Sequence, residues 1–145
     1  MRYVLYDSSH GNILLEKEIE FLKHYIALMK LRYCDKVKIN FSFPQQTEDV
    51  LVPPLLFVSF VENAFKHGIS YQSDSFIDIS LKVENGRLFF ICRNSKHESN
   101  SDSASGIGLE NVRKRLNLLF ADEYKLDIEN EDTIFVVNLE IPVKQ

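Results

Sequence analysis

The stretch "VPPLLFVSFVENAFKHG" (Val52–Gly68) decides how this sequence folds. Two prolines open a long apolar run, and proline suits the first turn of a helix, where its missing N–H group costs nothing. A glycine closes the run, as is typical of the residue that follows a helix. The stretch therefore predicts a helix from Pro53 to His67 that stops at Gly68.

Polar residues interrupt this apolar helix at five positions, which are Ser59, Glu62, Asn63, Lys66 and His67. Their spacing puts them in one narrow stripe, so the helix is expected to be buried around most of its circumference. The stripe could simply face solvent, with Glu62 and Lys66 as an ordinary ion pair one turn apart. It could also hold a ligand, because asparagine is a poor helix former and its amide oxygen suits Mg²⁺. Lysine and histidine can in turn donate to phosphate oxygens. Taken alone, the stripe leaves both interpretations open.

The next segment, residues 75–94, contains two apolar strands on either side of Asn85-Gly86. Asn-Gly is the strongest short signal for a two-residue turn, so we expect an antiparallel hairpin. The second strand ends at Asn94, whose amide could read the amino group and ring nitrogen of a base, or could merely end the strand in a turn. The segment from Ser95 to Ser105 is polar, serine-rich and without periodicity, which predicts a mobile loop.

A further helix is expected in "GIGLENVRKRLNLLF", where Gly106 and Gly108 directly precede its apolar face. The N–H groups of such a turn and the helix dipole can bind an anion, although two glycines are often no more than a turn. The dinucleotide-binding motif is excluded, because Asn111 replaces its third glycine and no strand precedes it. The basic run Arg113–Arg115 is interpreted as a solvated helix face, with contact to phosphate or to a partner domain as the alternative.

The remaining segments complete an α+β fold. Leu15 to Arg32 has the apolar spacing of a helix, whereas Lys36–Phe43 and the segments 124–130 and 133–143 alternate as strands do. We therefore expect a two-layer sandwich, with the helices on one face of a mixed β-sheet. The order of the elements does not fit the βαβ alternation of a Rossmann domain.

Length and composition fit one soluble domain. The chain has 145 residues, 45% of them apolar and 26% charged, with a formal charge of −4. This acidic balance argues against a nonspecific nucleic-acid-binding surface, which carries a basic excess. Cys34 and Cys92 are unclustered, which fits a reducing compartment such as the cytoplasm. Residues 1–11 are interpreted as the tail of an upstream helix and a linker, and residues 12–145 as the domain.

Taken in order, the polar-striped helix, the strand ending in Asn94, the polar loop and the Gly-x-Gly-Leu helix start resemble one known superfamily. This is the ATP-binding domain shared by histidine kinases, gyrase-type ATPases and Hsp90-type chaperones. "VENAFKHG" resembles its N box and "GIGLEN" its second glycine box. More narrowly, "LEKEIEFLKHYIALMKLRY", "VPPLLFVSFVENAFKHG", "RNSK" and "SGIGLENVRKRL" are similar to sensor histidine kinases of the LytS/YehU-like group. The similarity covers nearly the whole chain.

The resemblance implies a histidine-kinase-type ATP-binding fold and assigns roles to the polar stripe. Asn63 would coordinate the Mg²⁺ ion that bridges the ATP phosphates. Lys66 and His67 would contact phosphate or ribose. Glu62 lies beside the metal-binding position and could orient water, the metal or Lys66, which makes it the candidate catalytic residue.

The later segments receive roles by the same resemblance. Asn94 stands where most members of the superfamily have an adenine-reading aspartate, and the Asp-x-Gly-x-Gly pattern around it is missing. An amide can still accept from the adenine amino group, although with weaker selectivity. Gly106 and Gly108 would form the hinge of the ATP lid and donate to the phosphates, and Leu109 would lie at the edge of the pocket.

The implied function is that of the catalytic ATP-binding domain of a two-component sensor histidine kinase. It would bind ATP with Mg²⁺ and donate the γ-phosphate to a histidine outside this fragment, because His10 and His24 do not match the phosphoacceptor motif. The fragment alone is therefore expected to bind nucleotide with little or no autophosphorylation.

The partners implied are ATP, the kinase's own dimerisation and phosphoacceptor domain, and a response regulator that acts through the full-length kinase. No nucleic acid is expected as a partner. The full-length kinase would be a homodimer anchored in the bacterial inner membrane, with this domain in the cytoplasm. Whether the fragment alone is a monomer is left open.

Two other functions compete with this one. A degenerate, nonenzymatic module that senses nucleotide and contacts partners is favoured by the missing aspartate. An ATPase of the gyrase or chaperone type is disfavoured, because those enzymes carry an acidic base one turn before the N-box asparagine. In this sequence that position is Ser59.

Overall fold

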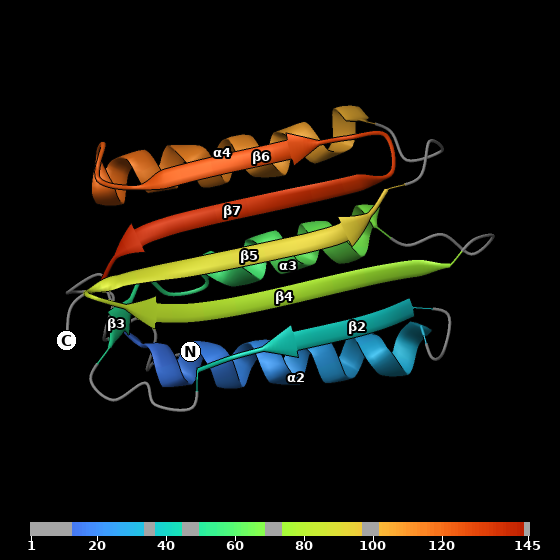
Figure 1. The fold of residues 1–145 in the computed structure, drawn as a ribbon, viewed down its shortest axis with the longest axis horizontal. Helices are drawn as coiled ribbons and strands as arrows, with labels where there is room; N and C mark the ends of the chain where they lie inside the picture. The colour runs from blue at the N-terminus through green and yellow to red at the C-terminus, as the bar shows by residue number, and fades with distance from the viewer. Residues whose placement is uncertain (1–12, 34–36, 45–49, 69–73, 97–101, 144–145) are drawn as a thin grey trace.

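The computed structural model of the chain describes residues 13–33, 37–44, 50–68, 74–96 and 102–143, and for residues 102–108 it describes the backbone alone. The elements are β1 (Ile13–Leu14), α2 (Leu15–Tyr33), β2 (Val37–Ser42), β3 (Leu51–Val52), α3 (Leu56–His67), β4 (Ser75–Glu84), β5 (Arg87–Ser95), α4 (Asp102–Phe120), β6 (Lys125–Asn130) and β7 (Ile134–Pro142). Figure 1 shows the long strands in front of the three helices.

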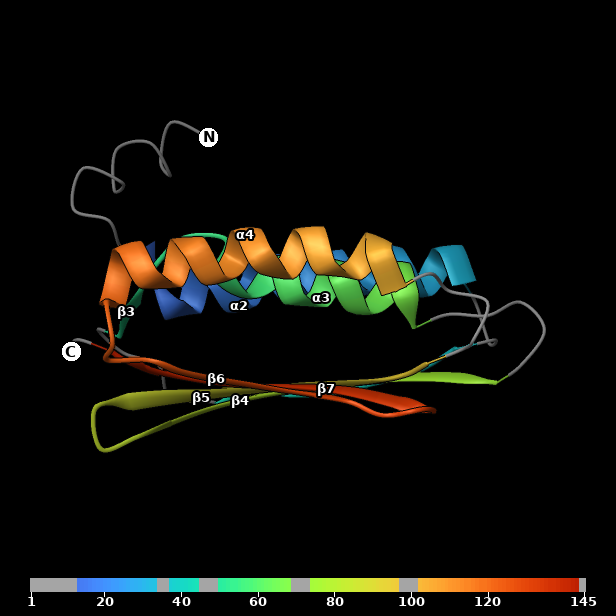
Figure 2. The same cartoon turned by 90° about the horizontal axis from the view of Figure 1, so that it is seen from above.

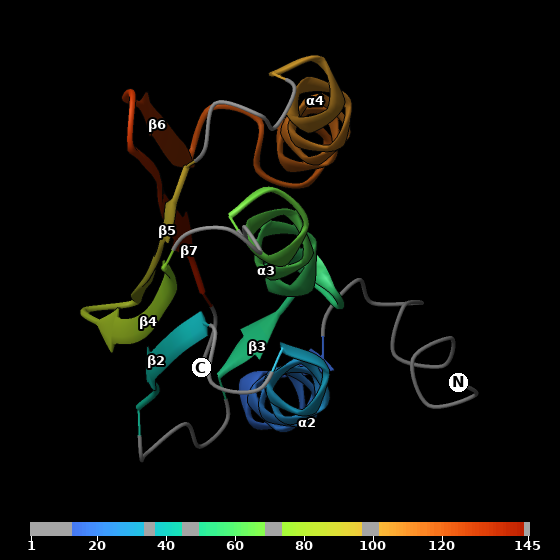
Figure 3. The same cartoon turned by 90° about the vertical axis from the view of Figure 1, so that its right-hand side faces the viewer.

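The architecture is a two-layer α+β sandwich, as the sequence predicts. Five strands form one sheet in the order β2-β4-β5-β7-β6, in which β2 and β4 are parallel and the other neighbours antiparallel. The helices of the described residues, α2, α3 and α4, all cover the same face of this mixed sheet, and α3 lies between the other two (Figures 2 and 3). In the described part of the chain, no helix has the length and apolar character that a bilayer span requires.

The centre of the core lies where α3 packs on β5. The rings of Phe57 and Phe60 lie 5.2 and 5.5 Å from that of Phe90, and all three side chains are fully buried. Burying one such side chain stabilises a fold by about 1.5–3 kcal/mol. This cluster holds the polar-striped helix against the central strand.

The β4–β5 hairpin confirms the turn that the sequence predicts. Asn85 and Gly86 both have positive φ angles, 52° and 76°, as the two central residues of a type I′ turn require. The turn pairs Glu84 with Arg87 and places Asn94 opposite Ile77, near the far end of the hairpin.

Two features near the start of α3 differ from the sequence prediction. The helix begins at Leu56 and not at Pro53, because Pro54 and Leu55 form a turn in which Leu55 is left-handed. The short strands β1 and β3 pair with each other, Ile13 opposite Val52, and were not predicted. Two-residue strands are too short to show an alternating pattern.

The predicted loop from Ser95 to Ser105 is wrong at both ends. Ser95 is the last residue of β5, and α4 already begins at Asp102, four residues before Gly106. Aspartate and serine favour the first turn of a helix, and alanine at position 104 has the highest helix propensity. These residues start the helix, which then continues through both glycines at a cost of about 1 kcal/mol for each. Residues 97–101 lie outside the described residues.

The proposed boundary between an upstream segment, residues 1–11, and a domain that begins at residue 12 also falls outside the described residues. It stays a prediction. His10, which does not match a phosphoacceptor motif, lies in the same segment.

We expect Gly86→Ala to destabilise the domain by about 1 kcal/mol, because only the left-handed conformation, and no crowding, opposes a side chain there. Urea denaturation of the variant measures this cost. Asn85→Gly is the matched control, and it should be tolerated because glycine adopts the same φ angle without strain. A cost below about 0.3 kcal/mol for Gly86→Ala would contradict the type I′ assignment.

Candidate functional site

The polar stripe predicted on α3 is present in the structure. Every other residue of the helix is buried, whereas the five polar residues are half-buried or exposed: Ser59, Glu62, Asn63, Lys66 and His67. Asn63 and His67 are half-buried, while Glu62 and Lys66 are exposed. The stripe is therefore the only open side of a helix that is otherwise enclosed by the core.

α3 begins without a capping side chain of its own. Its N-cap residue is Leu55, in the left-handed conformation (φ 59°), and its side chain makes no cap hydrogen bond. The N–H groups of Leu55 and Leu56 instead donate to the carboxylate of Glu18, which α2 carries into the interior with only 1% of its surface exposed. The helix dipole also favours a negative charge at this end. α2 therefore supplies the N-terminal cap of the helix that carries the polar stripe.

Arg115 of α4 completes this junction of three helices. Its guanidinium donates to the carbonyl oxygen of Pro54 and interacts electrostatically with Glu18. The interpretation of Arg113–Arg115 as a solvated face is thus wrong for Arg115, which is half-buried, while the other two residues are exposed. The reason is that Arg115 lies beside the buried Leu116, at the boundary of the apolar face of α4.

At its other end, α3 meets the end of β5. A Cβ atom placed on Gly68 would lie 2.8 Å from Nδ2 and 2.9 Å from Cβ of Asn94, so only glycine allows this approach. Asn94 is 3% exposed, and its Nδ2 donates to the Ser95 carbonyl at 2.7 Å. The Ser95 hydroxyl donates to the Gly68 carbonyl at 2.6 Å and accepts from the Phe76 N–H group at 3.1 Å. The end of the polar stripe and Asn94 are therefore fixed side by side.

Burial sets the charge states around the site. It lowers the pKa of His67, and the neighbouring Lys66 ammonium lowers it further, so the imidazole is neutral near pH 7 and donates a single N–H. Burial raises the pKa of Glu18 to about 7, although the Leu55 N–H group, Arg115 and the Leu56 N–H group act in the opposite direction. Glu18 therefore titrates close to neutral pH.

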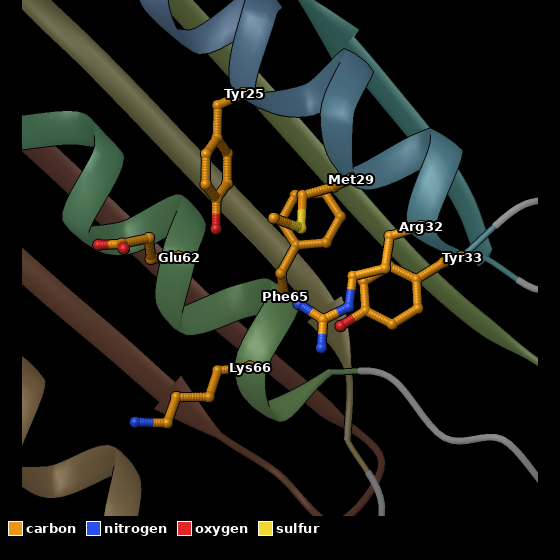
Figure 4. Close-up of a pocket in the computed structure, with 7 residues that line it drawn as sticks. All are labelled: Tyr25, Met29, Arg32, Tyr33, Glu62, Phe65 and Lys66. Atoms are coloured by element: carbon orange, nitrogen blue, oxygen red, sulfur yellow. The ribbon is translucent and has the colours of Figure 1, made fainter.

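A groove of about 440 Å³, the α2–α3 groove, runs along one edge of the stripe. It is lined by Tyr25, Met29, Arg32, Tyr33, Glu62, Phe65 and Lys66. Figure 4 shows that Phe65 points toward α2, whereas the side chains of Glu62 and Lys66 point away from it. Phe65 contacts both tyrosine rings, and Arg32 lies over the ring of Tyr33. Glu62 and Lys66 thus form the border between this groove and the rest of the stripe.

The two glycines occupy a different position from the one predicted. Gly106 and Gly108 lie inside α4, beyond its first turn, and do not form a turn before it. The N–H groups at such positions bond to carbonyls of the preceding turn. Leu109 is buried in the core, one residue after Gly108.

The fold thus brings the α3 stripe and Asn94 together, and it encloses α3 between its two neighbouring helices. Two residues of this arrangement were not singled out from the sequence: Glu18 and Ser95. Glu18 had a recognisable signal, because it is a charged residue on the apolar face of its helix, between Leu15 and Leu22. Ser95 had none, since serine is ordinary at the end of a strand.

The sequence of the chain is similar to those of known histidine kinases. A family model described as "Histidine kinase" matches residues 1–37. The sensor histidine kinase BtsS of Escherichia coli is 31% identical over 133 residues, which cover 90% of this chain and 24% of BtsS. The sensor histidine kinase/phosphatase LytS of Staphylococcus aureus is 33% identical over 141 residues, 87% of this chain and 24% of LytS. The chain spans about a quarter of the length of these curated relatives.

The fold of the chain is similar to that of solved histidine kinase domains. The catalytic domain of histidine kinase ThkA superposes with a TM-score of 0.67 at 16% identity, over 90% of this chain and 95% of that one. ThkA has also been solved in complex with a response regulator protein, TrrA. The fold is therefore that of histidine kinase catalytic domains. The sequence relatives show that the chain belongs to the sensor histidine kinases of the LytS and BtsS group.

We expect Gly68→Ala to destabilise the domain by about 1–3 kcal/mol, the usual cost of crowding a packed site. The new methyl group would approach the Ala64 carbonyl oxygen to 2.6 Å as well as the Asn94 amide, although the φ angle of −95° suits alanine. Urea denaturation measures the loss. In an Asn94→Gly background the cost should be smaller, because both the amide and the Cβ atom of residue 94 are then gone. An equal cost in both backgrounds would show that Gly68 and Asn94 are not in contact.

Proposed function

We propose that this chain is the ATP-binding catalytic domain of a two-component sensor histidine kinase, which binds Mg·ATP and donates the γ-phosphate to a histidine outside the fragment. One observation carries the proposal: Gly68 packs directly on Asn94, so the α3 stripe and the base-reading residue lie at one place. Residues of two chemistries, one suited to metal and phosphate and one to a base, therefore border a single site.

The metal and phosphate side of the site is assigned to the α3 stripe. The described residues hold no cluster of three or more His, Cys, Asp or Glu side chains, so a metal there would depend on the nucleotide's own oxygens. Asn63 fits this task, because its neutral amide oxygen can complete the coordination of Mg²⁺ held by phosphates. When bound, Mg²⁺ would neutralise charge on the β- and γ-phosphates.

The neighbours of Asn63 would act on the same phosphates. Lys66 is assigned to a phosphate oxygen as a point charge, and neutral His67 to phosphate or ribose through one N–H group. Glu62 borders the groove beside Lys66, and we assign it to orienting water or Lys66. These residues supply position and charge compensation, which phosphoryl transfer chiefly requires.

The adenine side is assigned to Asn94. Its Nδ2 is already engaged by the Ser95 carbonyl, which leaves its Oδ1 as the atom to accept from the adenine amino group. Guanine presents a carbonyl in place of that amino group, so this orientation of the amide supports a preference for ATP over GTP.

The lid side is assigned to residues 106–109. Within α4 the N–H groups of Gly106 and Gly108 are committed to the helix, so donation to phosphates would require the first turns of α4 to open. Glycine lowers the cost of that opening, because it stabilises a helix least among the non-proline residues. Leu109 would then bound the pocket from the core.

A second candidate is a nonenzymatic module that binds nucleotide and signals through partner contacts. The amide at Asn94, in place of a carboxylate, favours it. A stand-alone ATPase has less support, because the position one turn before Asn63 is Ser59, whose hydroxyl donates to the Leu55 carbonyl at 3.4 Å. That hydroxyl is a poor general base, and it is turned toward its own helix.

The remaining assignments concern the full-length kinase. We propose that it is a homodimer anchored in the bacterial inner membrane, with this domain in the cytoplasm. Its partners would be its own phosphoacceptor domain and a response regulator, as the ThkA complex with TrrA suggests by analogy. The formal charge of −4 fits the absence of a nucleic-acid partner.

We expect Asn63→Ala to weaken Mg·ATP binding by about tenfold or more, equivalent to about 1.4 kcal/mol, because it removes the assigned metal ligand. Calorimetric titration with Mg·ATP and Mg·GTP measures this loss and tests the preference for adenine. Asn138→Ala is the matched control, because Asn138 is also half-buried. It alternates along β7 with the buried Val137 and Leu139, and therefore lies on the sheet face opposite the helices. Unchanged affinity in Asn63→Ala would remove the central assignment.

We expect the chain to transfer labelled phosphate from ATP to a separate helical fragment that bears the phosphoacceptor histidine, and to label itself little or not at all. The same fragment with that histidine changed to alanine is the control. Tight Mg·ATP binding without any transfer would favour the nonenzymatic module, and steady hydrolysis without a histidine substrate would favour an ATPase.

A further inference from the structure

Glu18 is the one charged side chain that the fold buries completely among the described residues. It lies where α2, α3 and α4 meet, and it accepts from the N–H groups of Leu55 and Leu56 at the amino end of α3. Its second oxygen, Oε1, is buried without a hydrogen-bond partner in the described part of the chain. A buried carboxylate that is only partly satisfied is costly, and it calls for an explanation beyond packing.

The position of Glu18 relates it to the site in two ways. It caps the same helix that carries Asn63, and because a helix moves as a rigid rod, holding the amino end fixes the axial position of the stripe. It also interacts with Arg115, which in turn donates to the Pro54 carbonyl just before α3. Through Arg115 the cap reaches α4, the helix that contains Gly106 and Gly108. One carboxylate thus contacts α3, which carries Asn63, and interacts through Arg115 with α4, which carries Gly106 and Gly108.

We propose that Glu18 is a positioning residue for nucleotide binding: its ionised carboxylate caps α3 and, with Arg115, holds α3 and α4 in the arrangement that binds Mg·ATP. This inference rests on the proposed function for the identity of the ligand. It does not place Glu18 in contact with the nucleotide.

The charge on Glu18 makes a positioning role distinguishable from a structural one. Because the pKa in the fold, about 7, lies above the ordinary value of 4.5, the folded protein binds this proton more tightly than the unfolded chain. The stabilising contribution is therefore complete below about pH 4.5 and is lost as the pH rises toward 7. Near pH 8 the ionised carboxylate costs the fold stability, as functional groups often do. The described charged group that faces it is Arg115; β1, β3 and the start of α3 present none.

The test uses Glu18→Gln in the full 145-residue chain. Glutamine keeps the shape and one acceptor oxygen but stays neutral, so it imitates the protonated form at every pH. We expect it to raise stability at about pH 8 and yet weaken Mg·ATP binding by about fivefold or more, within the range of ordinary coupling energies. The ratio of the two dissociation constants should fall toward one at about pH 6, where Glu18 in the wild type is also protonated. Titration of ATP and of His67 is common to both proteins and cancels in this ratio.

Glu20→Gln is the matched control, because Glu20 is an exposed carboxylate on the same helix, paired with Lys17 at 3.7 Å. It should change neither stability nor affinity. Equal affinity of wild type and Glu18→Gln at about pH 8, or an affinity ratio that does not change with pH, would overturn the positioning role. A loss of stability at about pH 8 in Glu18→Gln, together with an unchanged affinity, would mean that the carboxylate serves the fold alone.

A nucleotide-independent measurement separates this inference from the proposed function. Amide exchange at Leu55 and Leu56, followed by NMR, should be faster in Glu18→Ala than in the wild type, because the acceptor of these N–H groups is gone. Absence of Mg·ATP binding in the wild type would refute the proposed function and the positioning role together, whereas unchanged exchange would refute the cap while leaving ATP binding intact.

Discussion

The enclosure of α3 is the constraint on which the rest of this structure depends. The helix lies on Phe90 of the central strand, with α2 on one side and α4 on the other, and only its polar stripe is open. A helix enclosed in this way cannot carry a wide polar face, so its polar residues must lie along the one side that is open. The same burial that stabilises the domain therefore concentrates asparagine, lysine and histidine in one place.

The parts of the fold that were predictable from the sequence are those governed by local chemistry. Apolar periodicity predicted α2, the prolines and glycine at the two ends of an apolar run predicted α3, and the Asn85-Gly86 pair predicted the central hairpin. Each of these signals lies within a short stretch of the sequence. The polar stripe was visible for the same reason. Its significance became clear only in combination with Asn94, and the contact through Gly68 that joins them is tertiary.

Of three features that were not predicted, two depend on residues distant in the sequence. A leucine at the start of α3 gives no hint of a cap, because the capping carboxylate comes from Glu18, 37 residues earlier. The start of α4 was misplaced, since two glycines weaken a helix but do not prevent one that Asp102 has already begun. Arg115 was predicted to face solvent because it lies in a basic run, but it is next to the buried Leu116 and donates to the Pro54 carbonyl. For the cap and for Arg115, tertiary packing outweighed local preference, whereas α4 begins where the local propensity of its first residues places it.

The junction of Gly68, Asn94 and Ser95 has a consequence for the order of events in binding. Asn94 lies on the central strand, flanked by Ile77 and Phe135 on the neighbouring strands, and its amide is already locked by a buried hydrogen bond. The half of the site that would receive a base is thus pre-organised, whereas the glycines that would receive phosphates are still committed to α4. A nucleotide would dock first through its base and only later recruit the lid. On that basis adenosine alone should associate about as fast as ATP, and the phosphates should mainly lengthen the residence time.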